Sequence, residues 1–354
     1  MRREIPATRP LAPARLPVQR PVDARLLVVD ARGNLSHLRR AQWLDALRAG
    51  DIVVANDAAT LPASLRAIHD RSGRSVELRL ARHVPPAHDG APRFDAVVFG
   101  EGDWRTRTED RPAPPPLSPG DRLAIGDGDA LIEALLEHPR MARLRFARDT
   151  AAVWSLLAHH GRPIQYAHLA VELEPWDVST PVAAVPVAFE APSAGFLLEW
   201  RGVQAMRTRG IAFATLTHAA GISSTGDAML DAQLPFAEPY RIPSSTARAV
   251  ARVRRAGGRV IAIGTTVVRA LEHAAAVDGI VHAGDGVADQ RIGAATRLRV
   301  VDALVTGTHE PGSSHHELLR AFTDDDTLAR AAVSMAEYGY RTHEYGDSML
   351  VEQR

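Results

Sequence analysis

The chain has 354 residues, of which 45% are hydrophobic and 24% charged. This length favours two domains, and the composition is typical of a folded globular protein rather than a disordered one. The sequence contains neither cysteine nor lysine, which excludes disulfides, thiolate nucleophiles, cysteine zinc sites, lysine Schiff bases and P-loop lysines. Because the 42 basic side chains balance 42 Asp and Glu, RNA binding would need a local patch rather than the overall field.

The sequence carries no signal for a membrane. No apolar run approaches the ~18 residues of a membrane-spanning helix, and the first residues have no apolar core of a secretory signal. We therefore expect a cytoplasmic protein that does not span a membrane. A monomer and a homodimer remain equally open.

The first part of the chain predicts an extended arm and then an α/β layer. Residues 1–21 are rich in Arg and Pro and show no periodicity. Apolar runs at residues 25–30 and 51–57 predict two buried strands. Between them apolar side chains recur at helical spacing over residues 38–47, and Gly50 stands where such a helix would end.

The pattern then changes to short strands of alternating polarity, separated by clusters of Gly, Asp and Pro. These strands fall at residues 75–80, 94–99, 122–125 and 143–146. Such spacing is typical of a small antiparallel sheet or barrel. We assign residues 67–148 to an inserted β-barrel domain.

The α/β pattern resumes with a helix over residues 150–160, which Asp149 and Thr150 are suited to cap. Further strands are expected at residues 185–189, 211–216, 259–263 and 298–301, and helices at residues 244–255 and 266–276. The predicted fold is thus an α/β main domain, residues 22–66 and 149–354, with a small antiparallel β-barrel inserted in it.

One strand-to-helix junction has the features of a ligand site. A buried run ends in Gly264, and Thr265 and Thr266 open a helix on which Arg269 follows one turn later. Ligands of open α/β sheets lie at such carboxyl ends of strands, where free N–H groups bind anions or polar ligand edges. The alternative is a simple helix cap with a solvent-exposed Arg. The segment is neither a Walker A loop nor a dinucleotide fingerprint.

Several segments, in chain order, resemble the S-adenosylmethionine:tRNA ribosyltransferase-isomerases, the family of queuosine biosynthesis. They are the blocks at residues 25–30 and 50–63, the turn at 191–195 (Ala-Pro-Ser-Ala-Gly, like the family's Ala-Pro-Thr-Ala-Gly), the junction at 257–272, and the segments 300–311 and 345–350. Because they keep this order from about residue 25 to residue 350, the chain resembles a divergent member of the family.

The resemblance implies an α/β domain with an inserted β-barrel, in agreement with the pattern. It also implies an enzyme that transfers and isomerises the ribosyl moiety of S-adenosylmethionine onto a 7-aminomethyl-7-deazaguanine base in tRNA. The product would be epoxyqueuosine, and adenine and methionine would leave. S-adenosylmethionine is then the co-substrate and tRNA the partner, and no metal is required because the sulfonium itself acidifies the neighbouring C5′ hydrogens.

The sequence departs from the family at several polar positions. The family's Leu-His-Phe is Phe-Leu-Leu at residues 196–198, and its Lys-Met-His-Ser-Glu segment corresponds to residues 234–238, without the Lys and the His. Two of its arginines are Ala59 and Ser64 here. These changes leave two alternatives open. Besides the full reaction on tRNA, the chain could be a paralogue that uses S-adenosylmethionine on a small molecule or cleaves it without RNA, or it could be a catalytically silent binding protein.

Three residues are candidates for catalysis. His218 follows an apolar strand and precedes a Gly- and Ser-rich loop, so it could serve as a base or bond loop carbonyls. Asp302 and His309 could form a carboxylate–imidazole pair, or Asp302 could cap a turn. His218 and His309 also match histidines of the family.

The donor-binding candidates follow from the junction and from the resembling segments. Glu190 stands at the end of an apolar strand, where it could take a ligand hydroxyl or cap the turn. Together with the junction, the set is Asn56, Asp57, Glu190, Ser193, Gly195, Gly264, Thr265, Thr266, Arg269, Tyr345 and Asp347.

Neither a metal site nor a strong RNA patch emerges from the sequence. Adjacent His315 and His316, with Glu317, would point about 100° apart on a helix and could not easily bind one ion. The candidate RNA patch is arginine-rich, because Arg pairs well with phosphate. It comprises Arg2, Arg3, Arg9, Arg15 and Arg20 of the arm with Arg105, Arg107 and Arg111 of the barrel, all of which could equally be solvated charge.

Overall fold

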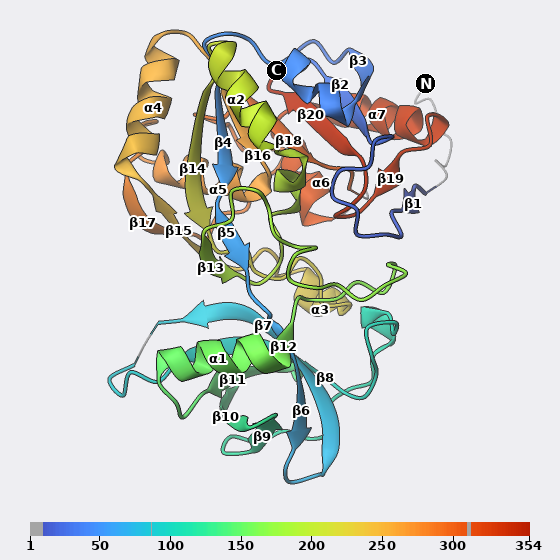
Figure 1. Ribbon diagram of the computed structural model, residues 1–354, viewed down its shortest axis with the longest axis vertical. Coiled ribbons are helices and arrows are strands. Elements are labelled where there is room, and N and C mark those ends of the chain that lie inside the picture. Colours follow the sequence, from blue (N-terminus) through green and yellow to red (C-terminus); the bar gives the residue numbers. More distant parts are fainter. Residues whose placement is uncertain (1–9, 86, 310–312) are drawn as a thin grey trace.

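The computed structural model describes residues 10–85, 87–309 and 313–354. A large domain built on a mixed sheet lies at the top of Figure 1, and a β-barrel lies below it. The expected fold class, an α/β main domain with an inserted antiparallel β-barrel, is confirmed.

The main domain is organised around a nine-stranded sheet. In sheet order its strands are β17 (Gly284–Ala288), β15 (Glu238–Ile242), β14 (Ala212–His218), β4 (Ile52–Asn56), β16 (Val260–Ile263), β18 (Ala303–Gly307), β20 (Ser348–Glu352), β2 (Arg25–Val29) and β3 (Leu35–Arg39). The four central strands β14, β4, β16 and β18 run parallel to one another. Their carboxyl ends therefore meet at one edge of the sheet.

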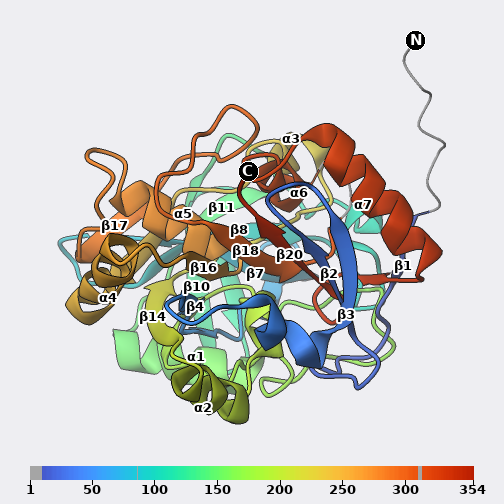
Figure 2. The same cartoon turned by 90° about the horizontal axis from the view of Figure 1, so that it is seen from above.

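Most residues of the central strands are apolar because both faces of the sheet are covered. Ile52 and Val54 of β4 belong to one hydrophobic cluster, and Val53 and Ala55, which point the other way, belong to another. In the view from above, α2 lies on one side of the sheet while α5, α6 and α7 lie on the other (Figure 2). Burial on both faces explains why the runs at 25–30 and 51–57, correctly predicted as strands β2 and β4, show no alternation of polarity.

Seven α-helices of the described residues pack around the nine-stranded sheet and the barrel. They are α1 (Thr150–His160), α2 (Trp200–Thr208), α3 (Ala228–Asp231), α4 (Ser244–Arg255), α5 (Thr265–Ala274), α6 (Ser314–Leu319) and α7 (Asp325–Glu337). The bounds of α1 and α4 are those predicted from the sequence. Asp149 caps α1 as expected, since its side chain accepts a hydrogen bond from the Ala152 amide.

Six antiparallel strands close the barrel. They are β6 (Ser64–His69), β7 (Arg74–Val84), β8 (Arg93–Phe99), β11 (Met141–Arg145), β10 (Gly128–Leu135) and β9 (Arg122–Ile125), and β9 pairs back onto β6. A seventh strand, β12 (Gly161–Arg162), pairs with the start of β6. The barrel core also takes up apolar residues of α1. The expected domain limits of 67–148 stay a prediction, although the barrel strands begin at Ser64 and α1 and β12 pack on them.

Two predicted elements are wrong. The helical spacing over residues 38–47 belongs to strand β3 and then to a 3₁₀ helix (Arg40–Ala46), because β3 pairs along its whole length with β2. The run at 298–301 is not a strand, and β18 begins two residues later. At β3 the long-range pairing of strands overrides the local pattern, whereas the amides of residues 299–301 donate to the Glu272 carboxylate instead of to a neighbouring strand.

The remaining short strands tie the chain ends and the linkers to the main domain. β1 (Ala12–Pro13) pairs with β19 (Arg341–Thr342), and β5 (Ala58–Thr60) pairs with β13 (Val185–Ala188). The described part of the predicted arm is thus packed against the domain; residues 1–9 lie outside the described residues. The Gln19 side chain also donates hydrogen bonds to the Asp177 and Ser179 carbonyls, at 2.8 and 2.9 Å.

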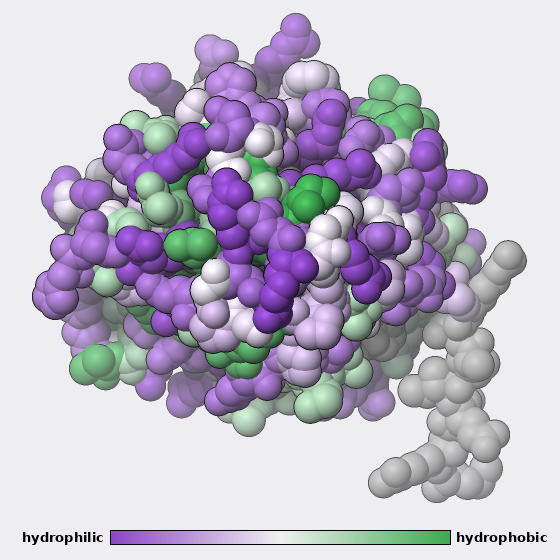
Figure 3. Space-filling view, turned by 90° about the horizontal axis from the view of Figure 1, so that it is seen from below, coloured by the Kyte–Doolittle hydropathy of each residue, from purple (hydrophilic) through white to green (hydrophobic). Residues whose placement is uncertain are grey.

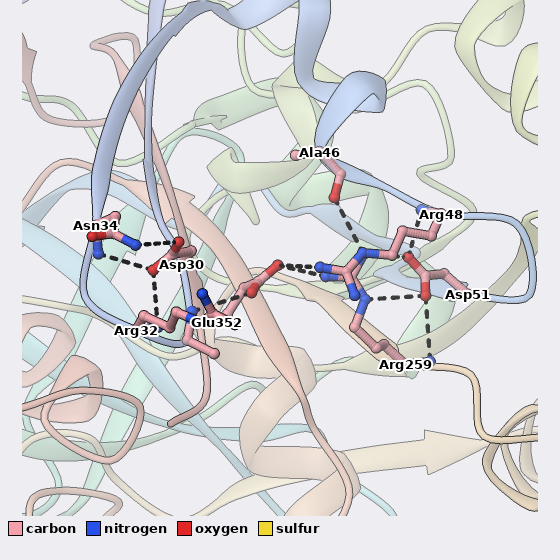
Figure 4. A network of polar contacts seen from close by, with 9 residues as sticks. Asp30, Arg32, Asn34, Ala46, Arg48, Asp51, Arg259 and Glu352 are labelled. Carbon is pink, nitrogen blue, oxygen red and sulfur yellow. Dashed lines mark hydrogen bonds and ion pairs between the residues drawn. The ribbon is translucent and has the colours of Figure 1, made fainter.

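Arg259 forms ion pairs with Asp51 and Glu352 at the other edge of the sheet, where the parallel strands begin (Figure 4). Arg259, which precedes β16, donates to Asp51 Oδ2 at 2.6 Å and to Glu352 Oε1 at 2.5 Å. Asp51 precedes β4, and Glu352 ends the antiparallel strand β20. This network therefore locks three strands at the edge opposite to their carboxyl ends.

Candidate active site

A cavity of about 370 Å³ lies at the carboxyl ends of the parallel strands. This volume falls within the roughly 300–1,000 Å³ of ordinary small-molecule sites. Its wall is made by segments that follow β13, β14, β16 and β18 and by the turn before β20, which are residues 190–194, 220–224, 264–269, 306–309 and 342–344. The site thus lies where open α/β sheets bind ligands.

The amino end of α5 forms one side of the cavity. Gly264, Thr265 and Thr266 all line it, and no described side chain caps the first turn of α5. Gly264 has φ +92°, and a Cβ there would lie 3.3 Å from Ala194 Cβ. Glycine therefore lets the chain turn sharply into the helix, and the helix N–H groups and dipole favour a negative or polar ligand edge.

A buried ion pair forms the floor behind this helix. Arg269 pairs with the Glu238 carboxylate and donates to the Ala288 carbonyl at 2.7 Å. Glu238 Oε1 in turn accepts a hydrogen bond from the Gly221 amide at 2.6 Å. Burial raises the pKa of Glu238, and the charge of Arg269 opposes that rise. The predicted solvent-exposed alternative for Arg269 is thus wrong, because its side chain is 5% exposed.

His309 lines the cavity at the end of β18. Its Nε2 is 3.0 Å from Thr306 Oγ1, and its ring stacks on His315 with the ring centroids 4.5 Å apart. Burial, followed by the neighbouring histidines, lowers the pKa of His309 well below its ordinary value. Burial also lowers the pKa of His315 to about 4. Both rings are neutral at pH 7.

Two carboxyl groups, those of Glu190 and Glu344, also line the cavity. Burial raises the pKa of Glu190 to about 7, although a hydrogen bond from Ser223 lowers it. Burial, and then the charge of Glu190, raises the pKa of Glu344 to about 7. Carboxyl groups whose pKa lies near neutrality are suited to proton transfer at physiological pH.

Half of the predicted site residues lie on the cavity wall and half do not. The seven on the wall are Glu190, Ser193, Gly264, Thr265, Thr266, Arg269 and His309. The structure places Asn56, Asp57, Gly195, His218, Asp302, Tyr345 and Asp347 elsewhere. The functional roles of all of them stay predictions.

Asn56 and His218 lie directly behind the wall, at the ends of adjacent strands. Asn56 Nδ2 donates to the His218 carbonyl at 2.9 Å and to Thr266 Oγ1 at 3.3 Å. The His218 ring is fully buried, and its Nε2 lies 3.6 Å from Glu238 Oε2. Burial, and then the charge of Arg269, lowers the pKa of His218 to about 3. His218 is therefore a weak base that a ligand in the cavity does not touch.

Three other predicted residues contact the chain around the site. Asp57 Oδ1 accepts a hydrogen bond from Thr217 Oγ1 at 2.6 Å. Gly195 makes room for Thr180, since a Cβ there would lie 3.0 Å from Thr180 Cγ2. Tyr345 donates to the Asp177 carbonyl at 3.1 Å.

Asp347 fixes the turn before β20. Its two carboxylate oxygens accept hydrogen bonds from the Arg25 and Arg341 amides, each at 2.7 Å. These contacts occupy the acceptors that a ligand would use. They hold in place the turn that carries Glu344 to the wall.

The predicted pair of Asp302 with His309 does not form. Asp302 precedes β18 and accepts a hydrogen bond from the Val260 amide at 2.7 Å. His309 follows the same strand, whose five residues rise about 3.3 Å each and so keep its two ends about 13 Å apart. Asp302 therefore lies at the opposite edge of the sheet, and its carboxylate is not part of the cavity.

The side chains with the best metal-ligand geometry are not those considered in the sequence. Within the described residues, His168, His343 and Glu344 place one ligand atom each within 4.8 Å of one another. The rings of His168 and His343 stack at a centroid distance of 4.3 Å. Ligand nitrogens bind metals in the plane of their rings, so stacked rings are not arranged to share one ion.

Among the described residues, the predicted RNA patch is only partly exposed. Arg111 is buried, where it pairs with the Glu77 carboxylate and donates to the Gly100 carbonyl at 2.8 Å. Arg105 and Arg107 are exposed. Arg2, Arg3 and Arg9 lie outside the described residues, whereas Arg15 and Arg20 are exposed. Hydrophilic residues cover most of the barrel end of the molecule (Figure 3), as on an ordinary solvated surface.

Fold and cavity together define an α/β protein with a cavity of small-molecule size at the carboxyl ends of its parallel strands and a β-barrel inserted in the chain. A family described as "Queuosine biosynthesis protein" matches residues 8–351. The chain is 35% identical to an S-adenosylmethionine:tRNA ribosyltransferase-isomerase of Sorangium cellulosum, over 93% of this chain and 92% of that protein. A protein of the same name in Thiobacillus denitrificans is 32% identical, with 93% and 91% covered. The chain belongs to the queuosine biosynthesis protein family.

A solved structure has the same fold. It is the S-adenosylmethionine tRNA ribosyltransferase of Thermotoga maritima, which superposes with a TM-score of 0.52 at 23% identity and covers 97% of this chain and 98% of its own. Among the described residues, no helix combines the length and the apolar character needed to cross a membrane.

The predicted set of site residues did not include several residues of the wall, above all Tyr166, Glu238 and Glu344. Glu238 begins β15 and closes the segment in which only the missing Lys and His were noticed. Glu344 directly precedes the recognised segment at 345–350. A charged residue next to a recognised segment was the available signal in both cases, but nothing local showed that its side chain is buried.

Proposed function

We propose that this chain is an S-adenosylmethionine-dependent ribosyltransferase-isomerase of queuosine biosynthesis. It transfers the ribosyl moiety of S-adenosylmethionine to a 7-aminomethyl-7-deazaguanine base in tRNA, rearranges it to epoxyqueuosine, and releases adenine and methionine. Family membership across residues 8–351 and the names of the relatives support this assignment. An enzyme that modifies tRNA is expected to act in the cytoplasm.

The observation that carries the proposal is the charge of the cavity wall. Glu190, Glu238 and Glu344 line the cavity, and Arg269, its one described Lys or Arg, is held by Glu238. The remaining wall is therefore acidic and attracts a cation. S-adenosylmethionine carries such a cation at its sulfonium.

The other end of the donor fits the amino end of α5. The methionine part of S-adenosylmethionine ends in a carboxylate, and a helix N-terminus stabilises a carboxylate through its free N–H groups and its dipole. Gly264, Thr265 and Thr266 present this end to the cavity. One cavity thus offers an acidic wall for the sulfonium and a positive helix end for the carboxylate.

Acid–base chemistry falls to groups that touch the cavity. His309 is neutral and lines the cavity, so it remains a candidate, although its low pKa makes it a weak base. Glu190 and Glu344, whose pKa is about 7, suit proton transfer near neutral pH better. His218 and Asp302 do not line the cavity. We propose that His218 supports the wall from behind, next to Glu238, and that Asp302 holds the start of β18 to β16.

The test is adenine release from S-adenosylmethionine by the purified chain. We expect release with a tRNA that carries the aminomethyl-deazaguanine base and none with the same tRNA carrying guanine. Release without any RNA would favour the alternative of a paralogue that acts on a small molecule or cleaves the donor alone. Because no metal is expected to take part, EDTA should leave the rate unchanged.

A further inference from the structure

A second cavity of about 270 Å³ adjoins the first on the side of the barrel. The barrel contributes Arg79 from β7 and the segment 107–109, and the main domain contributes the loop at 164–168. Six residues line both cavities, which are Tyr166, Glu190, Ser223, Ser224, His343 and Glu344. The two cavities are therefore connected compartments that share one wall.

The shared wall carries two carboxyl groups that form no ion pair with an arginine of the described part of the chain. Glu344 Oε2 is buried without a hydrogen-bond partner in the described part of the chain, and it lies 3.8 Å from His168 Nε2. Glu190 receives a hydrogen bond from Ser223. Both carboxyls also act on Tyr166, since burial and then the charges of Glu190 and Glu344 raise the pKa of its phenol. Tyr166 thus lies against the pair.

Flat rings surround the second cavity next to this pair. Tyr166, His168 and His343 line it, and the two histidine rings stack on each other. His343 has φ +70°, a conformation that a side-chain-bearing residue adopts only when its surroundings impose it. Aromatic and imidazole rings are the surfaces on which proteins stack unpaired bases. The volume suits one base better than a nucleotide chain.

We infer that the second cavity receives the acceptor base, and that Glu190 and Glu344, at its junction with the donor cavity, bind the aminomethyl group and take its proton. This inference rests on the proposed function. Arg107, which lines this cavity with a side chain 70% exposed and pairs with the half-exposed Glu109, would have to exchange that partner to meet a phosphate of the incoming RNA. The acceptor base then lies in the second cavity and the donor in the first, and the reacting nitrogen lies between them.

The proton step balances without a further reactant. A primary amine is protonated at neutral pH, since the reference pKa of a lysine amine is about 10.4. One N–H bond of the ammonium breaks, and the proton passes to a carboxylate oxygen of the pair. The electron pair of that bond stays on the nitrogen, which becomes the nucleophile toward the ribosyl group. A pair of carboxyls at one site favours the state with one proton, so one of them is ready to accept.

The groups that face the pair come from every element packed around it. Glu190 is affected by Arg79, Ser223 and Glu238. Glu344 is affected by Glu190 and lies beside His168 and Tyr345. Arg79 itself is held by Glu77, to which its Nε donates at 2.6 Å. Glu77 also pairs with Arg111, so it offsets only part of the charge of Arg79, and the attraction for a cationic ligand comes from Glu190 and Glu344 themselves.

Binding of free bases tests the inference without requiring turnover. Calorimetry would compare 7-aminomethyl-7-deazaguanine with 7-methyl-7-deazaguanine, which lacks the amine, on the full chain in the presence of S-adenosylmethionine. We expect the wild type to prefer the amine by about 10- to 100-fold, the range of a charge-assisted hydrogen bond. Glu344→Gln and Glu190→Gln should each reduce the preference, and Glu337→Gln, an exposed glutamate on α7, should retain it.

A wild type without preference for the amine, or a double Glu190→Gln/Glu344→Gln variant that retains it, overturns the inference. Failure of the proposed function looks different, because then the wild type releases no adenine even with the modified tRNA. In an active wild type, kcat/KM should fall below about pH 7, as the pair becomes fully protonated. Glu344→Gln should lower kcat, and Glu344→Asp should restore part of it. An unchanged pH profile in Glu344→Gln would equally contradict the inference.

Discussion

Replacing Glu344 by Gln should stabilise the protein in alkaline solution and leave its stability unchanged in acid. Burial and the charge of Glu190 raise the pKa of Glu344 from 4.5 to about 7. Its side chain is only 19% exposed, so solvent screens this effect little. Gln has the shape of the protonated carboxyl but does not ionise. The variant therefore removes the cost of burying the charge and keeps the packing.

The magnitude and the sign follow from proton linkage. Between pH 4.5 and about 7 the unfolded chain has released the proton of Glu344 and the folded chain has kept it. Stability is then fully present below the lower value and is lost as the pH rises through the higher one. A difference of about 2.5 pK units, at about 1.4 kcal/mol each, corresponds to about 3 kcal/mol.

Thermal unfolding of both proteins at about pH 5 and about pH 8.5 measures this difference, within the range where the linkage acts. We expect Glu344→Gln to unfold several degrees higher than the wild type at the alkaline pH and at nearly the same temperature at the acidic pH. Glu337→Gln is the matched control, because Glu337 is exposed. If Glu344→Gln changed the unfolding temperature equally at both pH values, or lowered it at the alkaline pH, Glu344 would not be a buried carboxyl with a raised pKa.

Two further substitutions test the wall of the donor cavity. Gly264→Ala places a side chain at φ +92° and 3.3 Å from Ala194 Cβ, so unfolding should become easier by about 1–3 kcal/mol and S-adenosylmethionine should bind more weakly by calorimetry. Gly202→Ala, in α2 with nothing within 4 Å, is the control and should be neutral or stabilising. Arg269→Gln leaves the Glu238 carboxylate buried without its cation, and denaturant unfolding should show a loss of about 3–5 kcal/mol. Adding Glu238→Gln should recover part of that loss, and a single Arg269→Gln variant as stable as the wild type would show that the pair contributes nothing.

The fold class could be predicted because its signals are local. Apolar runs such as residues 51–57 indicate strands buried on both faces, and alternating runs such as residues 122–125, which form β9, indicate a barrel. The helix at 150–160 begins after Asp149, whose side chain accepts a hydrogen bond from the Ala152 amide three residues later. The prediction of an element was wrong where the pairing with a distant strand determines the secondary structure. Residues 35–39 form a strand because β2 lies beside them, and no local pattern contains that neighbour.

The residues of the candidate site also fall into those that the local sequence predicts and those whose place depends on strand pairing. Gly264, Thr265 and Thr266 could be found from the sequence, since a strand, a glycine and a helix start follow one another within a few residues. Asp302 was misplaced because its position relative to the cavity depends on where β18 begins, and that is set by its pairing with β16 and β20.

The amino-acid sequence by itself determined the chemistry available to this protein: a cysteine-free and lysine-free chain, a strand-to-helix junction, and the segments of its family. Only the tertiary structure decided which groups act together. Tyr166, Glu190 and Glu344 come from three distant segments and meet at the wall between two cavities. The physical reason is that a carboxyl pKa depends on the burial and the charges around it in space, and those neighbours are supplied by the fold rather than by adjacent residues.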